Sequence, residues 1–551
     1  MPLPFRTLTV KETSYNMHYH LLQFLLLLSA AFLLILLARR LKIAYPIFLV
    51  IAGLIISNIP GLPVVNLEPD LVFLIFLPPL LYEAAWWTSW NDFWKWRRPI
   101  SLLAFGLVFF TSSIVAVAVS RIIPGFTLAT GFLLGGIISP PDAIAATSVL
   151  KSIRVPKRII TILEGESLVN DASSLIVFRF ALAAAVSGQF SMQTATLSFL
   201  TVTAMGIVIG LAVAYIVYLI HRFLPTTASI DSAFTIISPY LMYLAAEEFH
   251  FSGVMAVVSG GLFLSYRSHE IFMDGQSRLQ TLNVWSTLSI ILNGLVFILI
   301  GLELPAIVEG LEGYSLSQAC FYGIIVSLIV IAIRMIWIYP ATFIPRWLFK
   351  SIRQKEPTPG WKGAFVIGWA GMRGVVSLAA ALSIPLTLES GHALPERNLI
   401  IFITFVVILV TLVFQGLTLP LIIKMLKIEE IDPVIPEEKQ AAEIQIILIK
   451  TALTLLKSVN MIKMDANDLL GNLKAELEDG LAHTNRRLHC MECLEKDQLE
   501  LVGYRQVIKE IYAAQREALY HLRKGRRFSD EVIRKAEMQV DIAELKVFNP
   551  E

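Results

Sequence analysis

The chain has 551 residues, of which 56% are hydrophobic and 16% are charged, and its mean hydropathy is +0.68. Soluble globular chains carry about 25% charged residues, so this composition excludes an ordinary soluble protein and indicates one that crosses a membrane several times. The net charge of +2 gives no sign of a nucleic-acid partner, and three cysteines cannot build a disulfide framework.

Apolar segments follow one another until charged residues become dense near residue 428. We predict an all-α transmembrane domain over residues 1–427 and a small helical cytosolic tail over residues 428–551. The first apolar run, residues 21–38, is too long for a signal-peptide core and is followed by Arg-Arg-Leu-Lys, so we predict a retained span. The thirteen predicted spans are residues 17–38, 43–59, 68–86, 100–121, 127–150, 159–186, 194–220, 230–248, 252–266, 280–303, 316–345, 362–386 and 398–424.

Basic residues between these segments predict the orientation. With the N-terminus outside, the inner loops hold 20 lysines and arginines, and the outer loops with the N-terminal stub hold 4. Because positive loops stay in the cytoplasm, we expect a cell-membrane protein with its N-terminus outside and its C-terminus in the cytoplasm.

Three segments contain residues that interrupt helices. These are the third ("FLPPLLYEAAW"), the fifth ("GGIISPPDAIAATSV") and the twelfth ("GWAGMRGVVSLAAAL"). Broken helices in two distant halves of a membrane chain indicate the binding site of a transporter. The fifth and twelfth segments are seven apart, which suits two inverted repeats whose broken helices cross.

Charged and polar residues gather in the sixth segment and beside the break of the fifth. Asp171 lies thirteen residues after Arg158, about 20 Å along a helix and near the middle of the membrane. Helical spacing of four places two pairs on adjacent ridges of one face, Glu166 with Asn170 and Ser167 with Asp171. Asp142 follows the break, where its charge suits the exposed amides of a half-helix.

Oxygen atoms of this kind are the ligands that hard cations prefer. We expect Asp171, Asn170, Ser167 and Asp142 to bind a cation, with Ser139 as a further candidate. A carboxylate can hold a proton or a cation but not both, and this competition alone produces exchange if the site opens to one side at a time. Charged residues inside a span are costly, so each is a functional hypothesis.

Other charged residues have plainer interpretations. Glu166 and Arg373 are predicted to form a supporting ion pair, although Arg373 could instead face exposed carbonyls. Glu83 could line the site, sit at its mouth or only pack. Arg179 and Arg334 are expected to snorkel or to pair with an acid.

The motifs "GESLVNDA", "FLPPLLYEA", "SPPDAIAA" and "GMRGVVSLAAAL" resemble those of the monovalent cation:proton antiporter-1 family, the sodium/proton exchangers, over about residues 20–425. The resemblance implies that Asp171 carries the cation and the proton, with Asn170 as its partner and Asp142 on an unwound helix. It also implies thirteen spans, a homodimer, an elevator-type motion and, for an Asn-Asp pair, electroneutral exchange. Many members have threonine where this chain has Pro141, which leaves the choice between Na⁺, Li⁺ and K⁺ open.

The expected function is therefore antiport of a monovalent cation, Na⁺ first, against H⁺, serving pH and sodium homeostasis. A K⁺/H⁺ antiporter and a cation channel are the alternatives; single carboxylates in broken helices suit alternating access better than a pore. The chain has no His-Glu-x-x-His or Gly-x-Gly-Asp motif, so we expect a transporter without a cofactor, not an enzyme. The tail could bind a regulatory partner.

Overall fold

A computed structural model of the chain describes residues 10–59, 69–150, 153, 155–187, 192–271, 275–311, 313–355, 360–385, 394, 396–428, 437–459, 468–492, 507–508, 510–519, 521–522 and 530–548. The chain forms two compact units, Met1–Asp432 (the membrane unit) and Pro433–Glu551 (the tail unit). Three of the basic residues counted for the orientation, Arg6, Lys151 and Arg154, lie outside the described residues.

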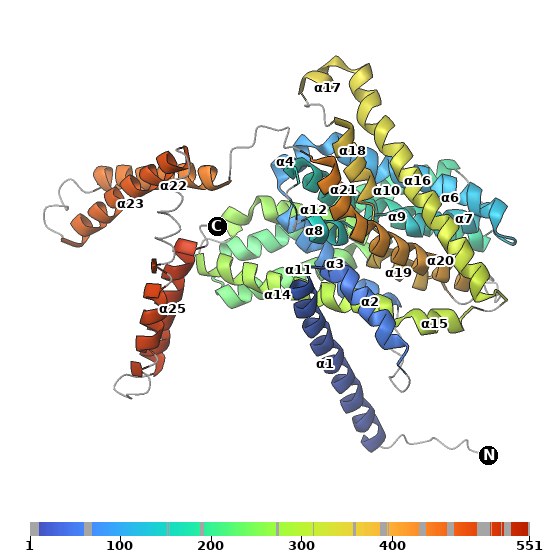
Figure 1. Ribbon diagram of the computed structural model, residues 1–551, viewed down its shortest axis with the longest axis horizontal. Helices are drawn as coiled ribbons and strands as arrows, with labels where there is room; N and C mark the ends of the chain where they lie inside the picture. Colours follow the sequence, from blue (N-terminus) through green and yellow to red (C-terminus); the bar gives the residue numbers. More distant parts are fainter. Residues whose placement is uncertain are drawn as a thin grey trace. The chain divides into compact units, whose positions relative to one another are not determined.

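Every regular element in the described part of the membrane unit is a helix (Figure 1). Each predicted apolar segment coincides with one helix or with a helix in two or three pieces. The helices are α1 (Val10–Leu41), α2 (Tyr45–Ser57), α3 (Pro69–Trp87), α4 (Trp90–Lys95), α5 (Arg97–Ser101), η1 (Leu102–Leu107), α6 (Val108–Ile122), α7 (Leu128–Ile138), α8 (Ala143–Leu150), α9 (Lys157–Ser187), α10 (Met192–Phe223), α11 (Ala228–Glu248), α12 (Gly253–Tyr266), α13 (Ser268–Ile271), α14 (Gly275–Leu302), α15 (Leu304–Glu309), α16 (Leu316–Leu348), α17 (Lys350–Lys355), α18 (Gly360–Trp369), α19 (Val375–Leu382), α20 (Arg397–Leu409), η2 (Val410–Gln415) and α21 (Gly416–Leu426).

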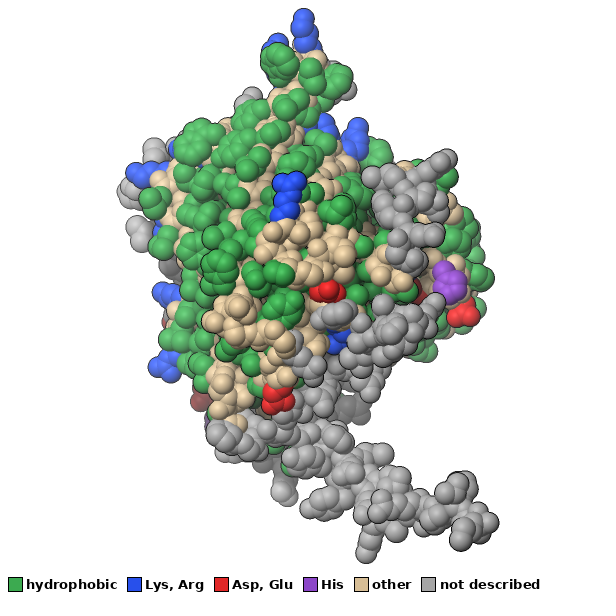
Figure 2. Space-filling view, turned by 90° about the vertical axis from the view of Figure 1, so that its right-hand side faces the viewer, with side chains coloured by type: hydrophobic (Ala, Val, Ile, Leu, Met, Phe, Trp, Pro, Cys, Tyr) green, Lys and Arg blue, Asp and Glu red, His purple; other side chains and the backbone are tan. Residues whose placement is uncertain are grey.

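Seven helical stretches among the described residues, some of them in two or three pieces, are long and apolar enough to cross a membrane. Large hydrophobic side chains are exposed along α10 and α16, among them Leu200, Ile216, Phe321 and Leu328. Figure 2 shows hydrophobic side chains spread widely over the described part of one face. A soluble protein does not expose so much contiguous apolar surface, so these faces fit contact with lipid, and the chain is a multi-pass membrane protein. The exact number of spans stays a prediction.

Two of the three predicted breaks are present. Residues 139–142 separate α7 from α8, and residues 370–374 separate α18 from α19. The predicted break in the third segment is wrong, because α3 runs through Pro78 and Pro79 as one helix. Proline at position 79 leaves the carbonyl of Ile75 without its usual partner, and the hydroxyl of Tyr240 in α11 donates to that oxygen at 3.0 Å. A side chain of α11 thus supplies the hydrogen bond that the proline removes, and α3 can continue without a break.

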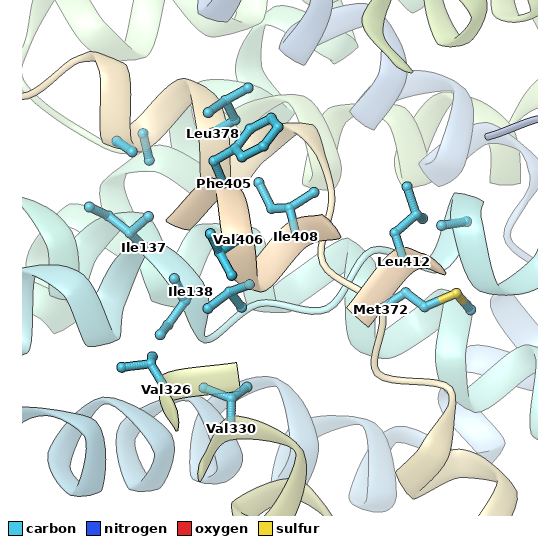
Figure 3. Close-up of a cluster of buried hydrophobic side chains, with 14 of the residues drawn as sticks. Ile137, Ile138, Val326, Val330, Met372, Leu378, Phe405, Val406, Ile408 and Leu412 are labelled. Carbon is cyan, nitrogen blue, oxygen red and sulfur yellow. The ribbon is translucent and has the colours of Figure 1, made fainter. Parts of the chain in front are cut away.

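A large core surrounds the two breaks (Figure 3). Ile137 and Ile138 at the end of α7 lie in it, together with Met372 from the second break. Their neighbours come from α16, α19, α20 and η2, namely Val326, Val330, Leu378, Phe405, Val406, Ile408 and Leu412. Close packing of this kind holds the interrupted backbone in one conformation.

The tail unit contains α22 (Glu437–Val459), α23 (Asp468–Glu492) and α25 (Asp530–Phe548). These helices agree with the helical spacing of apolar residues in its sequence. Within the unit, Arg516 binds Asp541 of α25 at 2.7 Å and also contacts Glu544. We predicted a boundary at residues 427/428, and the structure divides the chain after Asp432.

Candidate cation-binding site

The two interrupted helices touch at their breaks. The amide of Asp142 donates to the carbonyl of Met372 at 2.7 Å, so each break satisfies part of the other's freed backbone. Gly374 lies against the carboxylate of Asp142, and a Cβ atom on this glycine would be 2.0 Å from Oδ2. Only a residue without a side chain allows this approach.

The carboxylate of Asp142 caps the amino end of α8, which is the second half of the first interrupted helix. Its Oδ1 accepts the amide of Ile144 at 2.8 Å, in the first turn of α8. A negative charge is favourable at this end of a helix because the free amides there carry partial positive charge. The sequence-based placement of Asp142 at an exposed amide end is therefore confirmed.

Helix α9 passes beside the first break and supplies two polar side chains to it. The side-chain amide of Asn170 donates to the carbonyl of Pro141 at 3.1 Å. The hydroxyl of Ser167 accepts a hydrogen bond from the backbone amide of Ala143 at 3.1 Å. Both contacts hold backbone groups that the interruption leaves without helical partners. The pattern of polar residues in α9 therefore matches the unwound segment of its neighbour.

A cavity of about 690 Å³ lies next to this junction and is lined by Asp142, Ser167 and Asp171. Asp171 is 8% exposed, and among the hydrogen bonds between described residues none ends on its carboxylate. The carboxylate of Asp142 is held by α8, whereas that of Asp171 is available to a ligand. Hydroxyl and carboxylate oxygens around the cavity form a donor set suited to a hard cation.

The remaining predicted ligands occupy different positions. Glu83 lines the cavity from α3, together with Glu164 of α9. Asn170 is fully buried and does not line the cavity, and its side-chain oxygen has no hydrogen-bond partner among the described residues. Ser139 is also absent from the lining, and its hydroxyl donates to the carbonyl of Gly136 at 3.1 Å.

The partner predicted for Glu166 is wrong. Glu166 is fully buried and binds Arg334 of α16 through both carboxylate oxygens, with 2.5 Å to Nη1 and 2.8 Å to Nη2. Arg334 also donates to the carbonyls of Ile367 and Gly368 at the end of α18. One guanidinium group thus joins α9, α16 and the carbonyl end of α18, which is the first half of the second interrupted helix.

Arg373 caps the carbonyl end of α7, which is the first half of the first interrupted helix. Its Nε donates to the carbonyl of Ile138 at 2.7 Å, the last residue of α7, and its Nη1 donates to the carbonyl of Gly371 at 2.8 Å. A cation is favourable at the carbonyl end of a helix. The alternative that Arg373 faces exposed carbonyls is therefore the one that the structure supports. Arg179, near the far end of α9, pairs with Glu247 at 2.7 Å.

Some residues of the site gave no clear signal in the sequence. Thr411, in the π-helical turn η2, accepts the amide of Arg373 at 3.0 Å. Ser286, Ser289 and Asn293 of α14 also line the cavity. Their spacing of three and four residues along an apolar helix is the feature that could have indicated a polar stripe.

Two interrupted helices that meet at their breaks, with the half-buried Asp142 and the buried Asp171 beside the contact, define a class of helical membrane proteins that hold small ligands at discontinuous helices. The sequence profile described as "Sodium/hydrogen exchanger, transmembrane" matches residues 27–425. The chain belongs to the sodium/hydrogen exchanger family.

Individual relatives agree with this assignment. A "Sodium, potassium, lithium and rubidium/H(+) antiporter" of Bacillus pumilus is 34% identical over 399 residues, which are 69% of this chain and 58% of that protein. An uncharacterized Na(+)/H(+) exchanger of Escherichia coli K12 is 30% identical over 501 residues, 87% of this chain and 90% of its own. The structure of the sodium proton antiporter MjNhaP1 from Methanocaldococcus jannaschii at pH 8 has the same fold, with a TM-score of 0.58 at 20% identity, covering 76% of this chain and all of that one.

Proposed function

We propose that this protein exchanges a monovalent cation for a proton across the membrane, and that cation and proton compete for Asp171. The observation that carries the proposal is the contrast between the two aspartates that line the cavity. Asp142 is engaged by the amide of Ile144, while no hydrogen bond between described residues ends on the carboxylate of Asp171. A group that binds and releases an ion in each cycle needs this freedom.

The other residues around the crossing would keep the site in shape. Asn170 and Ser167 hold the unwound backbone, Arg373 caps the carbonyl end of α7, and Arg334 ties α18 to α9. In the loaded state the cation would take oxygen atoms from Asp171, Asp142 and Ser167. Protonation of Asp171 would remove the charge that attracts the cation and release it.

The walls of the cavity suggest how access would alternate. Some of its lining residues come from α8, α9 and α19, at or beside the crossing, and the others come mainly from α2, α3 and α14. A sliding motion of the first group against the second would carry the site from one side of the membrane to the other. The loaded carboxylate would be neutral in net charge during this movement, which lowers the cost of crossing hydrocarbon.

The central test replaces Asp171 by asparagine. In everted vesicles with a pH-sensitive dye, addition of Na⁺ should dissipate the proton gradient for the unaltered protein and not for Asp171→Asn. Glu247→Gln is the matched control, because it removes a carboxylate that pairs with Arg179 away from the cavity. Exchange that survives in Asp171→Asn would refute the proposal.

The cation is proposed to be Na⁺, with Li⁺ and K⁺ as candidates, since the Bacillus relative is named for four alkali cations. Comparing rates for Na⁺, Li⁺ and K⁺ in the same vesicles distinguishes a sodium exchanger from a K⁺/H⁺ antiporter. Cation flux that continues after the proton gradient has been collapsed with an ionophore would favour a channel.

We also propose that exchange is electroneutral, one cation for one proton, because Asn170 adds no charge beside Asp171. Asn170→Asp would replace the amide that donates to the carbonyl of Pro141 by a second carboxylate. Exchange should be insensitive to membrane voltage in the unaltered protein and voltage-sensitive in Asn170→Asp, if the variant still folds. Voltage-dependent exchange in the unaltered protein would contradict this stoichiometry, and Asn170→Ala serves as the control that removes the hydrogen bond without adding charge.

A further inference from the structure

Ser377 is a buried polar residue of α19 that has no role in the exchange cycle proposed above. It is 1% exposed and lines the same cavity as Asp142 and Asp171. Its hydroxyl oxygen has no hydrogen-bond partner among the described residues. Of the fully buried side-chain atoms that share this property in the described part of the chain, it is the one that belongs to the cavity lining. The candidate site therefore has an uncommitted oxygen at its edge.

Two half-buried serines of the same lining already use their hydroxyl groups. Ser167 accepts a hydrogen bond from the amide of Ala143 at 3.1 Å, and Ser148 donates to the carbonyl one turn before it at 2.7 Å. A bond of the second kind is common for serine inside a helix. One turn before Ser377 the backbone belongs to the interrupted segment 370–374, because α19 begins only two residues earlier. The break in the helix thus accounts for the missing partner.

The amino end of α19 brings Ser377 toward the carboxylate of Asp142. Gly374 is in direct contact with that carboxylate, since a Cβ atom on this glycine would lie 2.0 Å from Oδ2. Ser377 follows Gly374 by three positions, about one turn of helix, which places both residues near the same face of α19. The next two residues, Leu378 (Figure 3) and Ala379, are buried in two separate apolar cores. These contacts fix the helix that presents the serine to the site.

A buried hydroxyl without a partner is unfavourable, and native structures contain few such groups. A bound ligand that supplies the missing contact would remove this cost. The lone pairs of a serine oxygen can coordinate a hard cation, as carboxylate and carbonyl oxygens do. Because solvent hardly reaches this hydroxyl, it suits an ion that has already lost its water of hydration.

We propose that Ser377 is a further ligand of the transported cation and sets the affinity for it. In the cation-loaded state, its hydroxyl oxygen would coordinate the ion beside Asp142 and Asp171. The proton-loaded state makes no use of this oxygen, because the proton binds to a carboxylate. The inference rests on the exchange proposed above, and it adds α19 to the helices that contribute a ligand side chain. Ser377 would thus stabilise one of the two competing substrates and leave the other unaffected.

The test separates the affinity for the cation from the rate of transport. Na⁺ is titrated into everted vesicles, and the rate at which the proton gradient dissipates gives a half-saturating Na⁺ concentration and a maximal rate. Ser377→Ala should raise the half-saturating concentration roughly tenfold, the factor expected for one lost contact to a charged group. The maximal rate at saturating Na⁺ should change little, because the proton still binds to Asp171. A purely structural role would instead lower the maximal rate.

Ser383→Ala is the matched control. Ser383 lies at the other end of the same helix, does not line the cavity, and donates to the carbonyl of Ala380 at 2.9 Å. Its removal should leave the half-saturating Na⁺ concentration as in the unaltered protein. Ser377→Cys is a second test variant, which nearly keeps the volume of serine and replaces the oxygen by a soft sulfur atom. Since sulfur is a poor ligand for a hard cation, this variant should also raise the half-saturating concentration.

Two outcomes would overturn the inference. An unchanged half-saturating concentration in Ser377→Ala would show that the hydroxyl does not bind the cation, and an equal rise in Ser383→Ala would reduce the effect to a weakened helix. If Ser377→Ala elutes as an aggregate in size-exclusion chromatography, Ser377→Cys decides by the same measure.

Asp171→Asn, measured in the same vesicles, distinguishes this inference from the function on which it rests. Exchange that survives in Asp171→Asn would refute the proposed function. Loss of exchange in Asp171→Asn together with unchanged affinity in the Ser377 variants would refute only the role of Ser377.

Discussion

Two fully buried arginines perform separate tasks in the membrane unit. Arg334 neutralises Glu166 and caps α18, while Arg373 caps α7 and contacts no carboxylate through the hydrogen bonds described above. Both guanidinium groups end a half-helix and donate to carbonyls that have no partner within that helix. The difference between them is that only Arg334 has a bidentate anionic partner.

A double-mutant cycle measures this difference. Removing one partner of a buried ion pair leaves an uncompensated charge and costs about 3–5 kcal/mol. Glu166→Gln and Arg334→Gln should each lower the midpoint of thermal unfolding in detergent, and the double variant should fall no further than the worse single one.

The control for this cycle is the combination of Glu166→Gln with Arg373→Gln, whose effects on the unfolding midpoint should be closer to additive. Strong coupling of Glu166 to Arg373 and weak coupling to Arg334 would contradict the pairing described here.

Helical spacing explains why the polar face of α9 could be predicted and the ion pair could not. Neighbours at i and i+4 follow from local geometry, so the sequence predicts that Ser167 and Asp171 share one face, and both line the cavity. The partner of Glu166, Arg334, lies 168 residues further along the chain, and both Arg334 and Arg373 lie in apolar segments. No local feature of the sequence distinguishes these two arginines; the packing of α16 against α18 decides which of them pairs with Glu166.

At the scale of helices, the crossing depends on a close approach of backbone to side chain. Gly374 lies directly before α19 and against Asp142, and its φ of −136° is open to any residue. The requirement for glycine is therefore one of space, not of backbone conformation.

Gly374→Ala tests that requirement. The added methyl group would lie 2.0 Å from Oδ2 of Asp142 and must displace the carboxylate, at a cost of about 1–3 kcal/mol for overpacking. The exchange rate in vesicles should fall strongly. Gly275→Ala is the control, because a Cβ atom there meets nothing within 4 Å. Unchanged exchange by Gly374→Ala would show that the position of Asp142 is not critical.

A proline pair in a span does not by itself predict a break, because the outcome depends on contacts with distant residues. A Pro-Pro pair opens the first crossing helix at residues 140–141 and leaves α3 continuous at residues 78–79. The outcome depends on whether a neighbour satisfies the freed carbonyl, and that neighbour is distant in sequence. The existence of helices could be predicted from hydropathy, but their continuity required the tertiary structure.

At the scale of the whole molecule, the chain consists of two units with separate internal packing. The family profile ends at residue 425, close to the end of the membrane unit, while the match to the E. coli exchanger covers 87% of the chain. The tail therefore has counterparts in other members. Whether the tail binds a partner could not be predicted, because amphipathic helices without a motif do not define a ligand.

A chain truncated after Asp432 should fold and exchange ions, since the membrane unit contains the complete crossing and its core. We expect a single peak in size-exclusion chromatography and Na⁺-dependent dissipation of the proton gradient as in the full chain. Arg516→Gln in the full chain is the control that loosens only the tail. Aggregation of the truncated protein would show that the tail is needed for assembly.

The hydroxyl of Tyr240 that satisfies the carbonyl of Ile75 has an evolutionary consequence. A lineage that replaces Tyr240 by phenylalanine would expose that carbonyl to hydrocarbon unless position 79 regains a backbone donor. The two positions are therefore expected to change together, with the proline lost before or alongside the tyrosine. An alignment in which proline persists at position 79 without a hydrogen-bond donor at position 240 would show that another group can take the same role.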